Sequence, residues 1–288
     1  MNIPVEVPTQ KNPISKVLPH PTKELPVIKP AMQGDFLEQM SLTTTIHELL
    51  LKVTKNGTVF WVGAAVPIGT TNLTKIQVFF HPTVVQAGQV IATEGDYPEF
   101  KGGWSSSIQR YVELEGCQLA ASRQVAMLVP FTTMAAVSLG GPNNMFTADP
   151  VGTLKQITAA IQDRFISFGI PIFPAPELTA VGVTSFSSGI KAMRMFIDAM
   201  KPSGLVREVI DLDSPFIKTE PADLTLSPGA QSSCYTQRSR SNPPPGYKFL
   251  PTSSFAKLPK LNNDPGQHAH ACIGRMMYHM AMITSVIT

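Results

Sequence analysis

Short apolar runs and longer amphipathic stretches alternate along this chain of 288 residues. Six runs have the length and the apolar, β-branched content that is typical of buried strands. They are residues 46–53, 58–66, 75–81, 124–131, 178–184 and 205–212. Apolar residues recur every three or four positions in the stretches 104–123, 150–165 and 190–200, and the segment 271–288 is also largely apolar. Such spacing places apolar side chains on one helix face, so the pattern predicts alternating strands and helices.

The order of these elements predicts the class of fold. The first two runs are separated by Thr54-Lys55-Asn56-Gly57, and Asn-Gly favours a tight hairpin because both residues tolerate positive φ. From residue 75 onward strands alternate with helices, which predicts a mostly parallel sheet with helices on both faces. The sequence therefore predicts an α/β fold, with an antiparallel N-terminal hairpin at one edge of a mostly parallel central sheet.

Two regions break the alternation. Residues 1–40 form a proline-rich arm, and proline fixes φ and removes an N–H donor, so we expect an extended segment. The apolar residues of the arm suit packing on its own domain, with docking on a partner as the alternative. Residues 219–266 are rich in serine and proline and have little periodicity. We expect them to be an irregular excursion from a single domain over residues 41–288, and a mobile cover over its site.

Composition excludes several classes of function. The net charge is only +3 and 15% of the residues are charged, which is not the footprint of a nucleic-acid binder. The three cysteines lie far apart with no C-x-x-C pair, so they predict neither a disulfide framework nor a zinc site. Nucleotide-binding glycine motifs are missing, and we expect no cofactor. No apolar run reaches about 18 residues, so we expect no membrane span. No signal peptide is visible, which leaves the cytoplasm as the default compartment.

One stretch has the features of a reactive turn. Ser185-Phe186-Ser187-Ser188-Gly189 lies between the apolar run 178–184 and the amphipathic stretch 190–200. A strand that turns sharply into a helix pushes the side chain at its corner out of the sheet. The N-terminus of the helix then points free N–H groups at any negative charge that forms there. Ser187 is at this corner, and the small residues two positions before and after it leave room for the turn.

This stretch resembles the nucleophile elbow of α/β-hydrolases, with serine in place of the first glycine of G-x-S-x-G. The family's chain order is serine, acid, histidine, and this sequence offers the same order. Asp213 follows the strand 205–212, and Asp211 is the alternative acid two residues earlier. His270 precedes the terminal apolar segment, and His268 is the alternative base. The resemblance implies a triad of Ser187, Asp213 and His270.

The same resemblance implies an oxyanion hole of two backbone N–H groups. Ser188 supplies one of them, because it directly follows the candidate nucleophile. The second comes from the loop after the strand 75–81, which reads His81-Pro82-Thr83 in this chain. Proline has no N–H, so Thr83 is the expected donor.

These residues predict a serine hydrolase that cleaves a carboxylic ester, as esterases and lipases do, through an acyl-enzyme. The expected substrate is a small-molecule or lipid ester, and the oligomeric state is left open. The alternative is a non-catalytic protein that uses the hydrolase fold to bind a partner, because fold does not fix function. A metal hydrolase is disfavoured, because His268 and His270 are not four residues apart on a helix and have no neighbouring glutamate.

Overall fold

A mixed sheet of ten strands runs through the part of the chain that the computed structural model describes. This part comprises residues 5–6, 23–24, 45–55, 58–82, 85–86, 89–90, 125–130, 145–167, 169, 171–173, 177–214, 226, 228–258 and 260–287. The strands of the sheet are β1 (Val5–Glu6), β2 (Lys23–Glu24), β3 (Thr45–Lys55), β4 (Thr58–Pro67), β5 (Lys75–Phe80), β8 (Ala126–Pro130), β9 (Ala180–Phe186), β10 (Val206–Leu212), β11 (Gln231–Thr236) and β12 (Tyr247–Phe249). Two further strands, β6 (Val85–Gln86) and β7 (Gln89–Val90), pair with each other.

The helices are α4 (Met145–Ala148), α5 (Pro150–Ser167), α6 (Ile190–Met200) and α7 (Pro265–Ile283), with short 3-10 turns η3 (Ser187–Gly189), η4 (Lys201–Ser203) and η7 (Thr252–Phe255). Asp149 caps the start of α5, since its carboxylate accepts from the N–H of Gly152 at 3.0 Å and Pro150 is the first helical residue.

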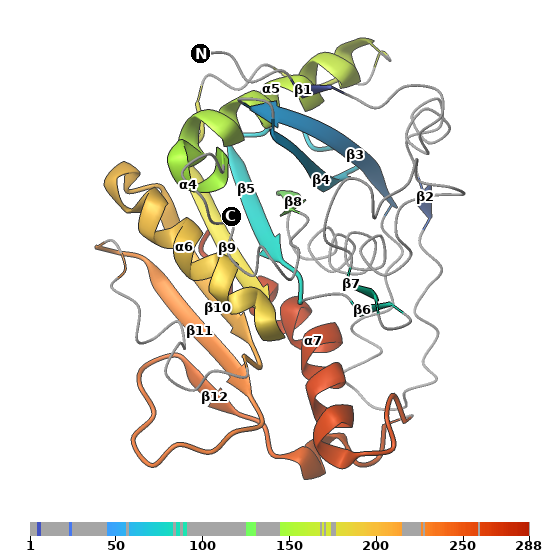
Figure 1. Cartoon of the computed structure of the whole chain (residues 1–288), viewed down its shortest axis with the longest axis vertical. Helices are drawn as coiled ribbons and strands as arrows, with labels where there is room; N and C mark the ends of the chain where they lie inside the picture. Colours follow the sequence, from blue (N-terminus) through green and yellow to red (C-terminus); the bar gives the residue numbers. More distant parts are fainter. Residues whose placement is uncertain are drawn as a thin grey trace.

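The strand order is β1-β3-β4-β8-β5-β9-β10-β11-β12, with β2 also paired to β3 (Figure 1). β3 and β4 form the predicted antiparallel hairpin, and β4 pairs antiparallel with β8. From β8 to β12 every pairing is parallel. The central strands β5, β8 and β9 are almost entirely buried, as is usual for parallel strands that are covered on both faces.

Consecutive residues of β5 show that helices cover both faces of the sheet. Phe80 packs on Phe196 of α6 with ring centroids 5.5 Å apart, whereas Phe79 packs on Tyr278 of α7, also at 5.5 Å. Neighbouring strand residues point to opposite faces, so α6 and α7 lie on opposite sides. Phe146 of α4 also contacts Phe196, which places α4 with α6. The α/β class with a hairpin, a mostly parallel sheet and helices on both faces is therefore confirmed.

Two segments of the stretch 219–266, which the sequence predicts to be irregular, are strands of the sheet. Residues 231–236 form β11, which extends the parallel sheet beside β10, and residues 247–249 form β12 beyond it. These residues are part of the sheet rather than a cover over a site. The stretch has no apolar alternation because the first residue of β11 is exposed, the next two are half-buried and only the last three are buried.

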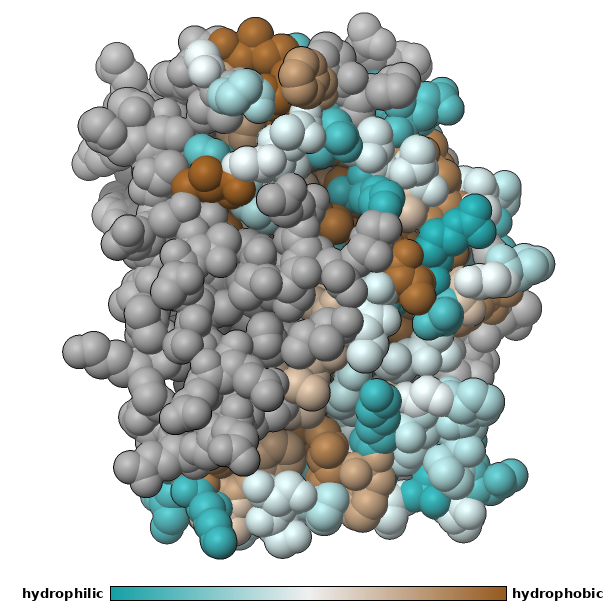
Figure 2. All heavy atoms as spheres, turned by 180° about the vertical axis from the view of Figure 1, so that it is seen from behind, coloured by the Kyte–Doolittle hydropathy of each residue, from teal (hydrophilic) through white to brown (hydrophobic). Residues whose placement is uncertain are grey.

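The last helix also begins earlier than the sequence indicates. Asp264 accepts from the N–H of Gln267 at 2.8 Å, and Pro265 is the first helical residue, so His268 and His270 lie inside α7 rather than before it. Of the proline-rich arm, the described residues pair with β3 through β1 and β2. The expected helix over 104–123 lies outside the described residues. None of the described helices is both long and apolar enough to cross a membrane. On the face opposite to that of Figure 1, hydrophilic and hydrophobic residues are mixed over the described surface (Figure 2).

Candidate active site

The turn after β9 has the strained geometry that a nucleophile elbow requires. β9 ends at Phe186, and Ser187 has a φ of 54°, a left-handed conformation that is uncommon for residues other than glycine. The 3-10 turn from Ser187 to Gly189 then leads directly into α6. A Cβ atom on Gly189 would lie 2.2 Å from the carbonyl oxygen of Phe80, so only glycine fits against the end of β5. Ser187 itself is half-buried.

The register of the parallel strands brings the candidate acid beside this turn. Phe186 at the end of β9 is level with Leu212 at the end of β10, so Ser187 and Asp213 follow a registered pair. Neighbouring strands lie about 5 Å apart, so both residues are at the same point of the sheet edge. Asp213 also has a positive φ, of 51°. His81 follows β5 at the same edge, because Phe80 is level with Ser185.

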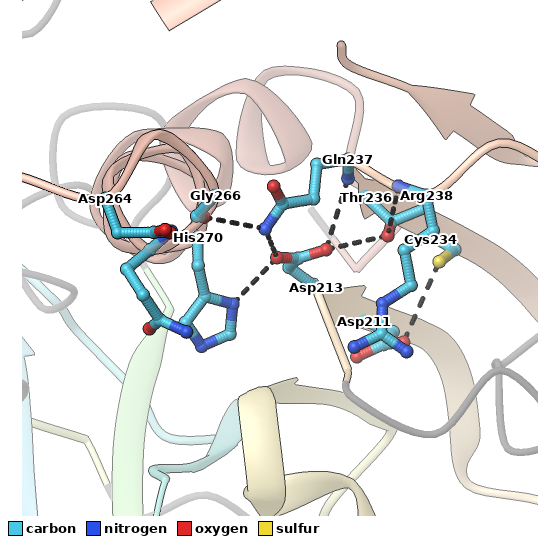
Figure 3. A network of polar contacts seen from close by, with 10 residues as sticks. Asp211, Asp213, Cys234, Thr236, Gln237, Arg238, Asp264, Gly266 and His270 are labelled. Atoms are coloured by element: carbon cyan, nitrogen blue, oxygen red, sulfur yellow. Dashed lines mark hydrogen bonds and ion pairs between the residues drawn. The ribbon is translucent and has the colours of Figure 1, made fainter. Parts of the chain in front are cut away.

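Helix α7 places the side chain of His270 next to that of Asp213. The Nδ1 atom of His270 lies 2.7 Å from Oδ2 of Asp213 (Figure 3). Asp213 is almost fully buried and also accepts from Oγ1 of Thr236 at 2.7 Å and from Gln237 through its backbone N at 3.2 Å and its Nε2 at 2.9 Å. Burial raises the pKa of Asp213, but the hydrogen bonds from His270, Thr236 and Gln237 together outweigh it, so the pKa lies below its usual value. The carboxylate is thus ionised and accepts the N–H of the ring.

The other ring nitrogen of His270 faces away from Asp213 (Figure 3). The ring packs on Phe186, the residue before Ser187, with centroids 4.7 Å apart and planes at 32°. Gly274 allows this approach, because a Cβ there would lie 2.4 Å from the ring of Phe186. The side chain of His270 is 23% exposed against 2% for Asp213, so the imidazole is partly accessible to solvent.

The two alternative residues have other partners. Leu261 donates its N–H to Nδ1 of His268 at 3.1 Å, so the Nε2–H of His268 donates to the carbonyl oxygen of Phe255 at 2.9 Å. Both ring nitrogens of His268 are thus occupied by backbone groups. Asp211 is fully buried and accepts from Oγ of Ser185 at 3.4 Å. The structure therefore brings Asp213 and His270 together and leaves Asp211 and His268 in separate buried contacts.

The expected oxyanion hole is described in part. Ser188 is half-buried directly after Ser187 in the turn, whereas Thr83 lies outside the described residues. His81 is fully buried, and its Nδ1–H donates to the carbonyl oxygen of Pro82 at 2.6 Å. Burial lowers the pKa of His81 to about 4, against a smaller opposite effect of that hydrogen bond, so this imidazole is neutral at pH 7.

Two residues of this site were not predicted from the sequence. Thr236 and Gln237 lie at the end of β11, inside the stretch expected to be irregular, and no motif marks them as partners of Asp213. A signal did exist for the start of α7, since Asp264-Pro265 repeats the Asp149-Pro150 pattern that begins α5. Among the described residues, no three His, Cys, Asp or Glu side chains gather closely enough to hold a metal ion.

Comparison with known proteins gives matches to solved structures alone. No family model matches this chain, and no curated protein does. A thermostable esterase from Pseudomonas putida is 13% identical, with a TM-score of 0.36 over 68% of this chain and 56% of that one. The rice cell wall degrading esterase LipA from Xanthomonas oryzae is 11% identical, with a TM-score of 0.35 over 61% of this chain and 44% of that one. The chain thus spans about half the length of the solved structures it matches.

Proposed function

We propose that this protein is a serine hydrolase that cleaves a carboxylic ester through Ser187, His270 and Asp213. The observation that carries the proposal is the position of His270. Its ring is hydrogen-bonded to the buried Asp213 on one side and packs on Phe186, the residue next to Ser187, on another. These contacts support the proposal, because a serine hydroxyl is activated by an imidazole that a carboxylate orients, and Ser187 directly follows Phe186 in a strained turn.

The expected reaction has two steps. His270 takes the proton of Ser187 through Nε2 while the serine oxygen attacks the ester carbonyl, and the same proton then goes to the departing alcohol. Water attacks the resulting acyl-enzyme in the same way and releases the acid. Asp213 holds the ring by accepting from Nδ1–H and stabilises the imidazolium that forms. The backbone N–H of Ser188, in the turn that leads into α6, stabilises the negative charge on the carbonyl oxygen.

The decisive test is covalent labelling with a fluorophosphonate probe, together with hydrolysis of a short-chain ester. Ser187→Ala should abolish both the labelling and the turnover while the protein remains folded. Ser188→Ala is the matched control, because it keeps the backbone N–H on which the expected role depends, and it should still be labelled. Full turnover by the Ser187→Ala protein, purified free of other esterases, would disprove the proposal and favour a partner-binding protein.

A further inference from the structure

The side chain of Gln237 connects two elements that are far apart in the sequence. Its Nε2 donates to Oδ2 of Asp213 at 2.9 Å and to the carbonyl oxygen of Gly266 at 2.9 Å (Figure 3). The amide nitrogen carries two hydrogens, so each of them has one acceptor. The backbone N–H of Gln237 adds a third bond, to Oδ1 of Asp213 at 3.2 Å.

Both ends of this bridge belong to the candidate site. Asp213 receives Gln237 and His270 on the same oxygen, Oδ2. Gly266 is in the first turn of α7, four residues before His270, so the two residues lie one above the other on one side of the helix. Fixing the carbonyl of Gly266 relative to Asp213 therefore also fixes where the helix places the imidazole.

We propose that Gln237 is a positioning residue of the site. Its amide stabilises the ionised carboxylate of Asp213 and holds the start of α7, the helix that carries His270, against that carboxylate. The catalytic consequence rests on the proposed function, whereas the effect on Asp213 does not. Gln237 acts through Asp213 and His270, so it needs no contact with substrate.

The charged groups near the network include Arg238, the residue after Gln237, whose backbone N–H donates to Oγ1 of Thr236 at 3.2 Å (Figure 3). Other ionisable groups nearby have contacts of their own. Asp211, on the same strand as Asp213, accepts from Ser185 of β9, and the thiol of Cys234 on β11 lies 3.7 Å from its Oδ2. On α7, Asp264 accepts from the N–H of Gln267 at the start of the helix.

His268 on α7 bonds backbone groups of Phe255 and Leu261. The hydrogen bond from Gln237 is one of the causes that lower the pKa of Asp213, so its removal should be visible in the titration of that carboxyl.

The test replaces the amide and reads the titration of Asp213 directly. Gln237→Met keeps the length of the side chain and removes both donors. The pKa of Asp213, followed by carbon NMR of its carboxyl, should rise, because the charged carboxylate loses a hydrogen bond. With a short-chain ester, kcat should fall about tenfold or more with KM little changed, because the interaction acts on the reacting groups rather than on substrate binding. Gln231→Met is the matched control at the exposed start of β11, and it should change neither value.

If Gln237→Met does not fold, the same titration is measured on a second variant, Gln237→Glu. Gln237→Glu keeps the shape and places a second carboxylate beside Asp213, so it should raise the pKa of Asp213 further. An Asp213 titration equal to that of the parent protein in the folded variants, or an unchanged kcat, overturns the inference. Loss of the proposed function is distinguishable, because Ser187→Ala tests the hydrolase alone, whereas the carboxyl titration reports on the bridge whether or not the protein has esterase activity.

Discussion

Two buried carboxylates, one near each end of strand β10, connect this strand to the two ends of helix α7. The two carboxylates differ in the groups that donate hydrogen bonds to them. At one end Asp213 bonds His270 in the second turn of the helix. At the other end Glu208 accepts from Oγ of Ser285 at 2.8 Å and from the N–H of Val286 at 3.3 Å, both just after the helix. Gln77 of β5 donates to the same carboxylate at 2.9 Å.

The donors from Gln77, Ser285 and Val286 to Glu208 are neutral, and Glu208 is 6% exposed within β10. Asp213 instead has a left-handed backbone, and its partner is an ionisable ring that is 23% exposed. A carboxylate that holds neutral donors fixes a helix in place. A carboxylate that holds an accessible imidazole, packed on the residue before a strained serine, can support chemistry. Similar buried acids thus have an anchoring role at one end and a proposed catalytic role at the other.

The largest effect should come from the two histidines of α7. His270→Ala removes the proposed base and should lower kcat/KM for a short-chain ester by about 10³-fold or more. His268→Ala removes a ring held by backbone groups, so it should lower stability and leave the activity of the folded protein nearly unchanged. Steady-state kinetics on folded samples of both variants measures this contrast. The reverse ranking would assign the base to His268.

The two acids of β10 should rank next. Asp213→Asn leaves the shape of the side chain and removes the charge that holds the ring of His270, so kcat should fall by roughly 10²-fold or more. Asp211→Asn alters a carboxylate bonded to Ser185 and should change kcat only mildly. The same ester assay decides between them, and equal losses would mean that the two carboxylates act as one unit.

Substitution of Glu208, the carboxylate with the anchoring role, should lower the stability of the fold rather than the rate of the reaction. Glu208→Gln replaces an acceptor by an amide and leaves buried donors unpaired, so it should cost roughly 2 to 3 kcal/mol of unfolding free energy. Urea unfolding measures this cost, and kcat should stay within about twofold. Glu177→Gln is the control, because its ion pair with Lys155 is exposed and worth little. A large loss of kcat would mean that the two ends are coupled.

The smallest effect concerns pH and His81, which lies at the same sheet edge as Asp213. Its pKa is lowered by burial to about 4, so between pH 6.5 and 4 the unfolded chain binds a proton that the folded protein does not. Stability from this group is therefore complete above pH 6.5 and falls as the pH drops toward 4. Between pH 7 and pH 5 the loss should be about 2 kcal/mol. His81→Asn should remove that part of the loss in urea unfolding at the two pH values, and an unchanged pH dependence would exclude His81 as its source.

Sequence patterns predicted the central strands because buried parallel strands are short apolar runs, and they predicted the turn at Ser187 because a strand-like run leads directly into an amphipathic helix. They missed β11, which begins with three polar residues, and which pairs with β10 although no motif lies between the two strands. The contacts of Gln237 depend on where α7 packs, which no local pattern contains. The choice between His268 and His270 is likewise beyond the sequence, because it depends on which face of α7 meets the sheet.

The polar stretch around β12 has a consequence for self-association. β12 is the last strand of the described sheet, and an unpaired strand edge is a template for pairing with another chain. This strand is only three residues long, carries Lys248, and is preceded by Pro243-Pro244-Pro245 and followed by Pro251. Proline cannot donate to a ladder, and a short strand with a lysine offers little to extend. The prolines and the lysine, which make this strand hard to predict from the sequence, should therefore also disfavour pairing with another chain at this edge.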